Sequence, residues 1–511
     1  MDLLQAPTLW QLLERRVEAT PQAAMFIDGR KHLHISFSQA RDIAERLAAG
    51  FLERGIGAGT RVTWMLPTGL PAVMTALALA RLGALQNPII SLYGEREVQG
   101  IVERSRSRFL LVPDSGERDF PAMADRLCQQ LQAPPQVIVM GATLPNGPAS
   151  SLPPAPAEGQ QVRWVYYTSG TTAEPKGAGH TDETLMIGGR NLARSMSVSA
   201  SDVGSIAFPY AHIGGAMYTT MMLAAGMSAV LLDRFQAQEA AEVFRRYGVT
   251  LAGGSTVHYQ LLLAEQRQQP TTPLLPGLRL LCGGGAPKPP ELYYQVRAEI
   301  GCGLIHNYGM TEIPLICAGN ALDSDEQLAN ADGVPMEDVE LRIVHPQGGE
   351  AEEGETGEIR VRGRAVFHGY TDPALNSAAF DGDGFFRTGD LGMRRADGRI
   401  VLTGRLTDVI IRKGENISAK EIEDLLFTHP KVSAVAVIGL PDKLRGERVC
   451  AVVELKPGVD ALQFEEMVDY FLEARVMRQK IPEQLEIVVE LPRNQSLNKM
   501  LKHVLRDQYA H

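Results

Sequence analysis

The chain has 511 residues, of which 44% are hydrophobic and 22% charged, and its formal net charge is −10. This composition is typical of a globular protein, and the length exceeds what one hydrophobic core usually supports, so we expect two or more domains. The acidic balance and the lack of a dense Lys/Arg cluster argue against a nucleic-acid-binding protein.

The first predicted element is an amphipathic helix near the N-terminus. Thr8, followed by Gln11 three residues later, resembles a capping box, and apolar residues recur at helical spacing from Leu9 to Val17. No basic region followed by an apolar run precedes this helix, so no signal peptide is expected.

Five cysteines lie far apart along the chain and form no CxxC pair: Cys128, Cys282, Cys302, Cys317 and Cys450. This pattern favours neither a disulfide framework nor a zinc site. We therefore expect reduced thiols and a cytoplasmic location.

Short apolar or β-branched runs alternate with helical patterns through the first 340 residues, which predicts an α/β fold with wound sheets. The predicted strands are residues 61–66, 228–232, 249–252, 278–282 and 304–306. Several of them end in glycine-rich or polar loops. Because ligands of open α/β sheets bind beyond the carboxyl ends of the strands, we expect the site there.

The segment from Val203 to Leu232 contains no Asp, Glu, Lys or Arg. A membrane-spanning helix needs about 20 mostly apolar residues in a row. Pro209, His212 and Gly226 interrupt this segment, so we predict a buried strand, helix and strand and no membrane span.

The pattern changes in the last third of the chain. Residues 339–404 predict short antiparallel strands in a small β-barrel-like subdomain, with a hairpin turn at Asp397-Gly398. A smaller α+β unit follows Arg405, with helices at residues 419–428 and 462–474 and strands at 432–437 and 449–455.

The richest motif is the loop Thr168-Ser169-Gly170-Thr171-Thr172-Ala173-Glu174-Pro175-Lys176-Gly177, directly after a predicted strand at Val162–Tyr167. Backbone amides, small hydroxyls and one lysine at the end of a strand suit a polyphosphate. The spacing of the common nucleotide-binding P-loop is absent. A plain Ser/Thr/Gly surface turn is the alternative for this loop taken alone.

Three further motifs follow in order: Asn307-Tyr308-Gly309-Met310-Thr311-Glu312, then Arg387-Thr388-Gly389-Asp390, then Gly404-Arg405 with Lys413-Gly414-Glu415-Asn416. With the loop, they resemble the adenylate-forming superfamily, which includes acyl- and aryl-CoA synthetases, peptide-synthetase adenylation domains and beetle luciferases. The resemblance runs from about Leu9 to Arg506. It implies a large N-terminal domain, residues 1–405, and a C-terminal lid, residues 406–511, with the hinge at Thr407.

The resemblance implies a reaction in two halves. A carboxylate attacks the α-phosphorus of ATP, an acyl-adenylate forms, and pyrophosphate leaves. The thiol of coenzyme A then takes the acyl group and AMP leaves. Catalysis of the first half rests on positioning and on stabilisation of negative charge, with Mg²⁺ as the implied cofactor beside ATP and coenzyme A.

Residue roles follow from the matching positions. The implied ATP- and AMP-binding residues are Thr168, Ser169, Gly170, Thr171, Thr172, Lys176, Gly283, Gly284, Gly285, Asn307, Tyr308, Gly309, Asp390 and Arg405. Tyr308 would stack on adenine, Asp390 would accept the ribose hydroxyls, and Thr311 would bond the α-phosphate. Glu312 would hold the metal together with Thr172.

The implied catalytic lysine is Lys499, where the family has a Gly-Lys pair after a proline. The motif here departs from the family, because Asn498 replaces the glycine and the spacing from Pro492 is one residue longer. Lys502 is the alternative. A lysine has a long flexible side chain, and on a mobile loop it can bring its positive charge to the site in the one half-reaction that needs it.

The segment around His212, with Gly214, Gly215 and Met217, resembles the acyl pocket of these enzymes, and His212 is also a catalytic candidate. No acidic residue lies between Asp202 and Asp233, which disfavours an amino-acid substrate because its ammonium would be buried unpaired. Lys413, Gly414 and Glu415 match the loop that lines the coenzyme A tunnel.

The sequence thus predicts a ligase that makes acyl-CoA from a small-molecule apolar or aromatic acid. Alternatives are an enzyme that loads an acyl carrier protein, a non-catalytic acyl- or nucleotide-binding protein that keeps the fold, and a luciferase-like oxygenase, to which nothing in the sequence points. The pattern of residues leaves the acid itself open.

Overall fold

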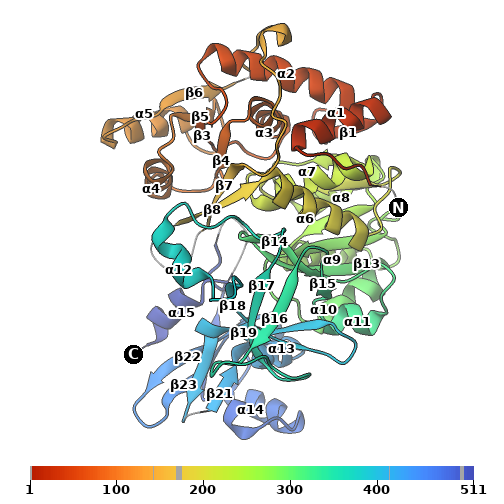
Figure 1. The fold of residues 1–511 in the computed structure, drawn as a ribbon. Coiled ribbons are helices and arrows are strands. Elements are labelled where there is room, and N and C mark those ends of the chain that lie inside the picture. The colour runs from red at the N-terminus through yellow and green to blue at the C-terminus, as the bar shows by residue number, and fades with distance from the viewer. Residues whose placement is uncertain (1–2, 142, 169–174, 414, 495–499, 511) are drawn as a thin grey trace.

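The structure is a computed structural model and describes residues 3–141, 143–168, 175–413, 415–494 and 500–510. Its N-terminal part holds two large sheets with helices packed around them (Figure 1). One hydrophobic core runs through both sheets, from Phe26 and Leu281 in the one to Trp64 and Phe109 in the other. The predicted wound α/β architecture is confirmed.

The first sheet has six strands in the order β6-β5-β3-β4-β7-β8, and only the β7–β8 pair is antiparallel. Its strands are β3 (Arg61–Trp64), β4 (Leu85–Pro88), β5 (Phe109–Pro113), β6 (Gln136–Met140), β7 (Val162–Thr168) and β8 (Lys176–Thr181). Helices α2 (Phe37–Glu53), α3 (Leu70–Leu82), α4 (Glu95–Ser105) and α5 (Phe120–Gln130) belong to the same stretch of chain.

The second sheet has nine strands in the order β15-β14-β13-β12-β11-β9-β10-β1-β2. Its strands are β1 (Ala24–Asp28), β2 (Leu33–Ser36), β9 (Val203–Ile206), β10 (Ser228–Leu231), β11 (Leu251–Gly254), β12 (Leu280–Gly284), β13 (Gly303–Met310), β14 (Ile313–Ala318) and β15 (Val334–Pro335). The accompanying helices are α1 (Leu9–Ala19), α6 (Asp182–Ser195), α7 (Ile213–Ala225), α8 (Ala237–Arg246), α9 (Thr256–Gln268), α10 (Pro290–Gln295) and α11 (Asp325–Asn330).

Local signals place several of these helices. Helix α1 begins where the Thr8 hydroxyl accepts a hydrogen bond from the Gln11 amide, as the capping pattern predicts. Helix α7 ends at Gly226, whose φ of 83° is a left-handed cap that glycine adopts without strain. The charge-free segment forms β9, α7 and β10, and no helix in the described ranges is long and apolar enough to cross a membrane.

Residues 340–405 form a four-stranded antiparallel sheet in the order β16-β17-β18-β19. Its strands are β16 (Glu340–Val344), β17 (Gly357–Arg362), β18 (Phe386–Arg394) and β19 (Ile400–Arg405), and the short helix α12 (Asn376–Ala379) precedes β18. The predicted hairpin at Gly398 is confirmed between β18 and β19. Strands β16 and β19 are the two edges, so the described strands of this subdomain form an open sheet rather than a closed ring.

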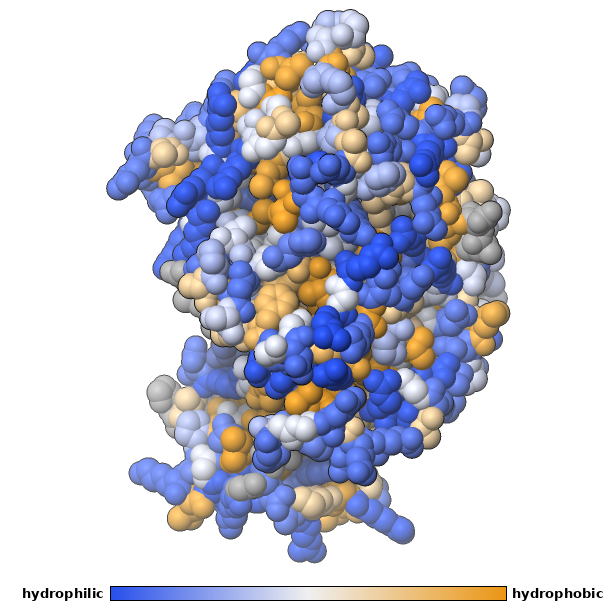
Figure 2. Space-filling model, viewed as in Figure 1, coloured by the Kyte–Doolittle hydropathy of each residue, from blue (hydrophilic) through white to orange (hydrophobic). Residues whose placement is uncertain are grey.

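The C-terminal unit follows a short 3₁₀ turn at Leu406–Asp408 and has its own hydrophobic cores. It consists of β20 (Val409–Arg412), β21 (Glu415–Ser418), α13 (Ala419–Phe427), β22 (Val432–Asp442), β23 (Gly446–Leu455), α14 (Phe464–Glu473), β24 (Gln484–Val488) and α15 (Lys502–Tyr509). In Figure 1 it lies, drawn in blue, at the end of the molecule opposite to α2 and α3. Figure 2 shows the same face as largely hydrophilic, with hydrophobic residues in small separate groups.

Candidate active site

A cavity of about 2000 Å³ lies where the carboxyl ends of strands from both large sheets meet. The loop after β3, the β7–β8 pair, and the ends of β11, β12 and β13 all contribute to its lining. This is the edge at which parallel sheets of α/β proteins bind ligands. The cavity therefore brings together motifs as far apart in the sequence as Thr168 and Arg405.

Lys176, Glu312 and Tyr370 form one end of the cavity. Thr168 and Lys176 pair across β7 and β8, so both ends of the phosphate-type loop are fixed, whereas Ser169, Gly170, Thr171 and Thr172 lie outside the described residues. The Lys176 Nζ lies 5.6 Å from the centre of the Tyr370 ring. The Tyr370 hydroxyl donates to Glu312 Oε1 at 2.6 Å, which orients this largely buried carboxylate on the wall.

The neighbourhood of Glu312 fits a hard cation that is held mainly by a substrate. No cluster of three or more His, Cys, Asp or Glu that could hold a metal occurs in the described part of the chain. Mg²⁺ is commonly bound by one or two carboxylates together with substrate phosphates. Glu312 supplies one such carboxylate, and Thr311 lies beside it on the same cavity wall.

Gly283, Gly284 and Gly285 follow one another along the cavity wall at the end of β12. A Cβ atom on Gly283 would lie 2.4 Å from the Tyr259 hydroxyl oxygen, and one on Gly284 would lie 2.4 Å from the Asn307 carbonyl oxygen. Glycine is required here because neighbouring strands and helix α9 approach the backbone closely.

Asn307 presents an unsatisfied acceptor beside this glycine wall. Its side-chain nitrogen donates to Cys282 Sγ at 3.1 Å, whereas its Oδ1 is buried and has no hydrogen-bond partner among the residues that the structure describes. An unpaired buried acceptor is costly and rare in native proteins. A ligand amine in this part of the cavity would satisfy it, and the exocyclic amine of adenine is such a group.

Tyr308 and Asp390 lie just behind the cavity wall. Asn307 and Gly309 line the cavity, but Tyr308 between them faces the other way, as alternation along β13 requires. The Tyr308 hydroxyl donates to Asp390 Oδ2 at 2.9 Å, and Arg405 Nε contacts Asp390 Oδ1 at 2.8 Å. Tyr308 is only 5% exposed, so its stacking on adenine stays a prediction.

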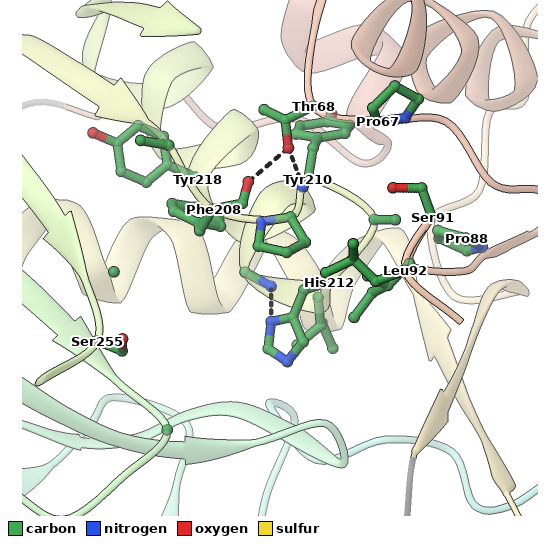
Figure 3. A pocket seen from close by; sticks show the side chains of 18 of the residues that line it. Pro67, Thr68, Pro88, Ser91, Leu92, Phe208, Tyr210, His212, Tyr218 and Ser255 are labelled. Carbon is green, nitrogen blue, oxygen red and sulfur yellow. Dashed lines mark hydrogen bonds between the residues drawn. The ribbon is translucent and has the colours of Figure 1, made fainter. Parts of the chain in front are cut away.

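The predicted acyl segment lines the other end of the cavity (Figure 3). His212 caps helix α7 by accepting a hydrogen bond from the Gly214 amide at Nδ1, and burial lowers the pKa of its imidazole to about 4. His212, Gly214 and Met217 lie on the wall. Gly215 does not: a Cβ there would lie 2.0 Å from the Tyr210 carbonyl oxygen, so this glycine serves backbone packing instead.

Several wall residues were missed in the sequence because they come from elements without a family-like motif. Thr68, after β3, donates its hydroxyl to the Phe208 carbonyl at 2.7 Å and accepts from the Tyr210 amide at 2.9 Å (Figure 3). It thereby fixes the loop that carries His212. Ser255 ends the loop Gly253-Gly254-Ser255, which lies at a predicted strand end and was expected near the site, whereas His258 on α9 was missed.

The remaining predicted residues lie in or near the C-terminal unit. Lys413 and Glu415 are exposed and do not line the cavity, and Gly414 lies outside the described residues. Thr407 lies in the turn between the units, where its carbonyl accepts from Arg506 at 3.3 Å.

Of the two candidate lysines, Lys499 lies outside the described residues. Arg493 and Asn494, a few residues before it, line the cavity, so this segment reaches the site. Lys502 instead pairs with Glu423 on α13 at 2.7 Å. The structure therefore gives Lys502 a contact within the C-terminal unit and none with the cavity wall.

The model of the AMP-binding enzyme family matches residues 13–371, and the model of the AMP-binding enzyme C-terminal domain matches residues 421–497. A medium-chain fatty-acid–CoA ligase of Escherichia coli is 29% identical over 97% of this chain and 89% of its own. A salicyl-AMP ligase/salicyl-S-ArCP synthetase of Mycobacterium tuberculosis is 32% identical over 90% of this chain and 83% of its own. The crystal structure of ATP-bound MatB from Rhodopseudomonas palustris superposes with a TM-score of 0.87 at 26% identity, covering 98% of this chain and 99% of that one.

Proposed function

Because the chain belongs to the AMP-binding enzyme family, a group of acid–thiol ligases, we propose that it is an ATP-dependent acyl-CoA synthetase for an apolar carboxylic acid. It would activate the acid as acyl-AMP with release of pyrophosphate, and then transfer the acyl group to coenzyme A. The observation that carries this proposal is the single cavity, which joins a cationic end, an end with an unsatisfied acceptor beside a glycine wall, and an uncharged end.

In the first half-reaction the two substrates meet inside this cavity. The nucleotide base would lie on the glycine wall with its amine on Asn307 Oδ1, and the phosphates would extend toward Lys176 and Thr168. The carboxylate of the acid would approach the α-phosphorus from the side of His212. Because attack adds negative charge to a group that already carries it, nearby cations lower the barrier.

Mg²⁺ would bind to Glu312, with Thr172 as the second protein ligand that the sequence predicts, and would neutralise phosphate charge. Within the chain, the Tyr370 hydroxyl keeps Glu312 Oε1 in place and leaves Oε2 for the ion. Lys176 offers a point charge at the pyrophosphate end of the cavity. Thr311, next to Glu312 on the cavity wall, would donate its hydroxyl to the α-phosphate.

The second half-reaction requires a path for a long thiol. We infer an N-terminal domain of residues 1–405 and a C-terminal lid of residues 406–511 that moves about Thr407. The single chain crossing at Leu406–Asp408 and the separate cores of the C-terminal unit support this division. Such a motion would bring the exposed loop with Lys413 and Glu415 to the cavity, where it would line the tunnel for coenzyme A.

The first test is exchange of labelled pyrophosphate into ATP with Mg²⁺ and without coenzyme A, across fatty, alicyclic, aryl and terpenoid acids. We expect exchange that depends on the acid, because reversible formation of acyl-AMP needs only ATP and the carboxylate. A matched Glu312→Gln variant keeps an acceptor for Tyr370 but loses the charge, so exchange should fall by roughly 10²-fold or more.

Adding coenzyme A separates the proposal from its nearest alternative. Acyl-CoA formation and steady release of AMP would support a CoA ligase. Acyl-AMP that accumulates unchanged with coenzyme A, and is consumed by a phosphopantetheinylated carrier protein, would support a carrier-loading enzyme like the salicyl relative. ATP binding without exchange for any acid would contradict both and favour a non-catalytic protein.

A further inference from the structure

One part of the cavity wall is rich in aromatic side chains. We call it the acyl chamber and define it by Phe208, His212, Tyr218, Phe235, Ser255 and His258, all of which line the cavity. Burial lowers the pKa of both His212 and His258 to about 4, so both rings are neutral at pH 7. The acyl chamber thus carries no formal charge of its own, whereas Asp233 and Arg234 line the cavity directly before Phe235.

The aromatic side chains stand edge to face in two pairs. The rings of Phe208 and Tyr218 are 6.1 Å apart at 68°, and those of Phe235 and His258 are 4.5 Å apart at 63°. Aromatic groups prefer edge-to-face contacts over face-to-face stacking. Each pair in the acyl chamber leaves ring faces and edges at which a further aromatic group could make such a contact. The chamber walls consequently favour a planar ring as the acyl group.

The position of the His258 ring is set by its backbone surroundings. Helix α9 begins after Ser255, and the preceding Gly254 has a φ of 145°. A Cβ atom on Gly254 would lie 3.0 Å from the His258 ring, so a side chain there would displace the imidazole. The glycine thus lets the ring fold back over the end of β11 and meet Ser255.

Hydrogen bonding fixes the protonation of the Ser255–His258 pair. The Ser255 amide nitrogen lies 3.2 Å from His258 Nδ1 and can only donate, so Nδ1 accepts and carries no proton in the neutral ring. The Ser255 Oγ lies 3.0 Å from the same Nδ1, and because that nitrogen has no proton the hydroxyl is the donor.

Ser255 Oγ therefore acts as a hydrogen-bond acceptor on a mostly aromatic wall. Because its proton is engaged by His258, the Ser255 Oγ can offer only a lone pair to a ligand. Ser255 lies on the cavity wall across from His212 and Tyr218 (Figure 3). The acyl chamber thus provides a hydrogen-bond acceptor, and an acid that lacks a donor would leave this lone pair desolvated and unpaired.

We propose that the acid is a planar aromatic carboxylic acid with an O–H or N–H group on the ring, and that Ser255 Oγ accepts the hydrogen bond from this group. The proposal rests on the proposed function, since it names the class of acid that the same site would activate. It makes Ser255 a specificity-determining residue and His258 the residue that positions it.

The experiment compares acids that differ only in the donor. The probes are phenylacetate against its three ring-hydroxylated isomers, and indole-3-acetate against 1-methylindole-3-acetate, with kcat/KM taken from acid-dependent pyrophosphate release. We expect kcat/KM for the best donor acid to exceed that of its partner by about 10-fold. In Ser255→Ala this ratio should fall to near one.

A second variant distinguishes loss of the hydroxyl from loss of stability. Ser255 is the N-cap of α9, and alanine at an N-cap is costly, whereas glycine is nearly as good as serine there. Ser255→Gly should therefore lose the donor preference with an unchanged melting temperature, and Ser255→Thr, which keeps a hydroxyl, should restore the preference. A preference that survives in both Ala and Gly variants would overturn the proposal.

Calorimetric measurement of Kd for the same acid pairs tests this inference independently of the proposed function. A lower Kd for the donor acid, lost in Ser255→Gly, would support recognition by Ser255 even without turnover, and missing pyrophosphate release would then count only against the ligase activity. Equal Kd values within both pairs, or tighter binding of a fatty or dicarboxylic acid, would overturn the inference while an active ligase remained.

Discussion

Asp390 joins two predicted motifs and the start of the connection to the C-terminal unit. Its carboxylate is 5% exposed, accepts from the Tyr308 hydroxyl and pairs with Arg405. Asp390 itself lies behind the cavity wall, so its contact with the ribose hydroxyls stays a prediction. Arg405 lies on the cavity wall directly before the 406–408 turn, next to the proposed hinge.

Replacing Asp390 tests its assigned ribose role. Asp390→Asn keeps an acceptor for Tyr308 but removes the charge, and hydrogen bonds to charged groups are the stronger ones, so Kd for ATP should rise about 10- to 100-fold. The order of preference among acids should stay the same. Calorimetric ATP titration and pyrophosphate exchange across the acid panel measure the two quantities.

Tyr308→Phe is the matched control, because it removes one hydrogen bond from the same carboxylate and keeps the charge. Its effect on Kd for ATP should be smaller, below about tenfold. An altered acid profile in Asp390→Asn, with ATP binding unchanged, would contradict the role that the sequence assigns to this residue.

The sequence named residues for the candidate site but not the face that each one presents. Tyr308 was expected to stack on the ligand, whereas alternation along β13 puts Asn307 on the wall and Tyr308 behind it. His258 could not be found from the sequence, because no local pattern specifies that its ring folds back to within 3.0 Å of Ser255 Oγ.

At the scale of elements, the start of α7 contains two adjacent glycines with different tasks. A Cβ on Gly215 would lie 2.0 Å from the Tyr210 carbonyl oxygen and 2.8 Å from the carbonyl carbon. Gly215→Ala should therefore lower the free energy of unfolding by about 1–3 kcal/mol, the usual cost of overpacking. The apparent melting temperature and the urea midpoint are the measurements.

Gly214→Ala is the neighbouring control. A Cβ on Gly214 would lie 3.4 Å from His212 Nδ1 and 3.6 Å from a Phe208 ring carbon, which is ordinary contact. This variant should keep its melting temperature and instead lower kcat/KM for the bulkiest accepted acids, because Gly214 lines the cavity. Greater destabilisation by Gly214→Ala than by Gly215→Ala would show that the packing of α7 differs from the structure.

Strand boundaries show why local propensity was insufficient. The sequence predicts strands at residues 249–252 and 278–282, but β11 and β12 extend to Gly254 and Gly284. Glycine is a poor strand former, so both ends were assigned to loops. In the structure the pair of strands requires it: a Cβ on Gly253 would lie 2.1 Å from the Cys282 carbonyl oxygen.

At the scale of the whole molecule, the order of structural classes could be predicted and the pairing of distant strands could not. The α/β, antiparallel and α+β stretches follow the patterns in the sequence. However, β1 pairs with β10, about two hundred residues further along, and no local pattern specifies that partner. Such pairs depend on the common core of both large sheets rather than on any one segment.

The C-terminal unit contacts the rest of the chain through both polar and apolar groups. The Ser418 hydroxyl donates to the Thr403 carbonyl on β19 at 2.6 Å, and Phe427 on α13 packs against the core of the two large sheets. Interfaces between domains of one chain are commonly of this mixed kind and permit relative motion. They suit a lid that takes up different positions in the two half-reactions.

The two lysines near the end of the chain give the sharpest test of such a lid. Lys499→Ala should lower acyl-AMP formation by about 10²–10³-fold, because one charge that stabilises the reacting phosphate is lost. It should largely spare the transfer of an acyl group from supplied acyl-adenylate to coenzyme A.

Lys502→Ala breaks the pair with Glu423 inside the C-terminal unit, so it should lower the melting temperature and change both half-reactions little. Separate assays of the two half-reactions measure these effects. Equal loss of both halves in Lys499→Ala, or a selective loss of adenylation in Lys502→Ala, would move the catalytic role away from Lys499 and would require α15 to leave α13 during the reaction.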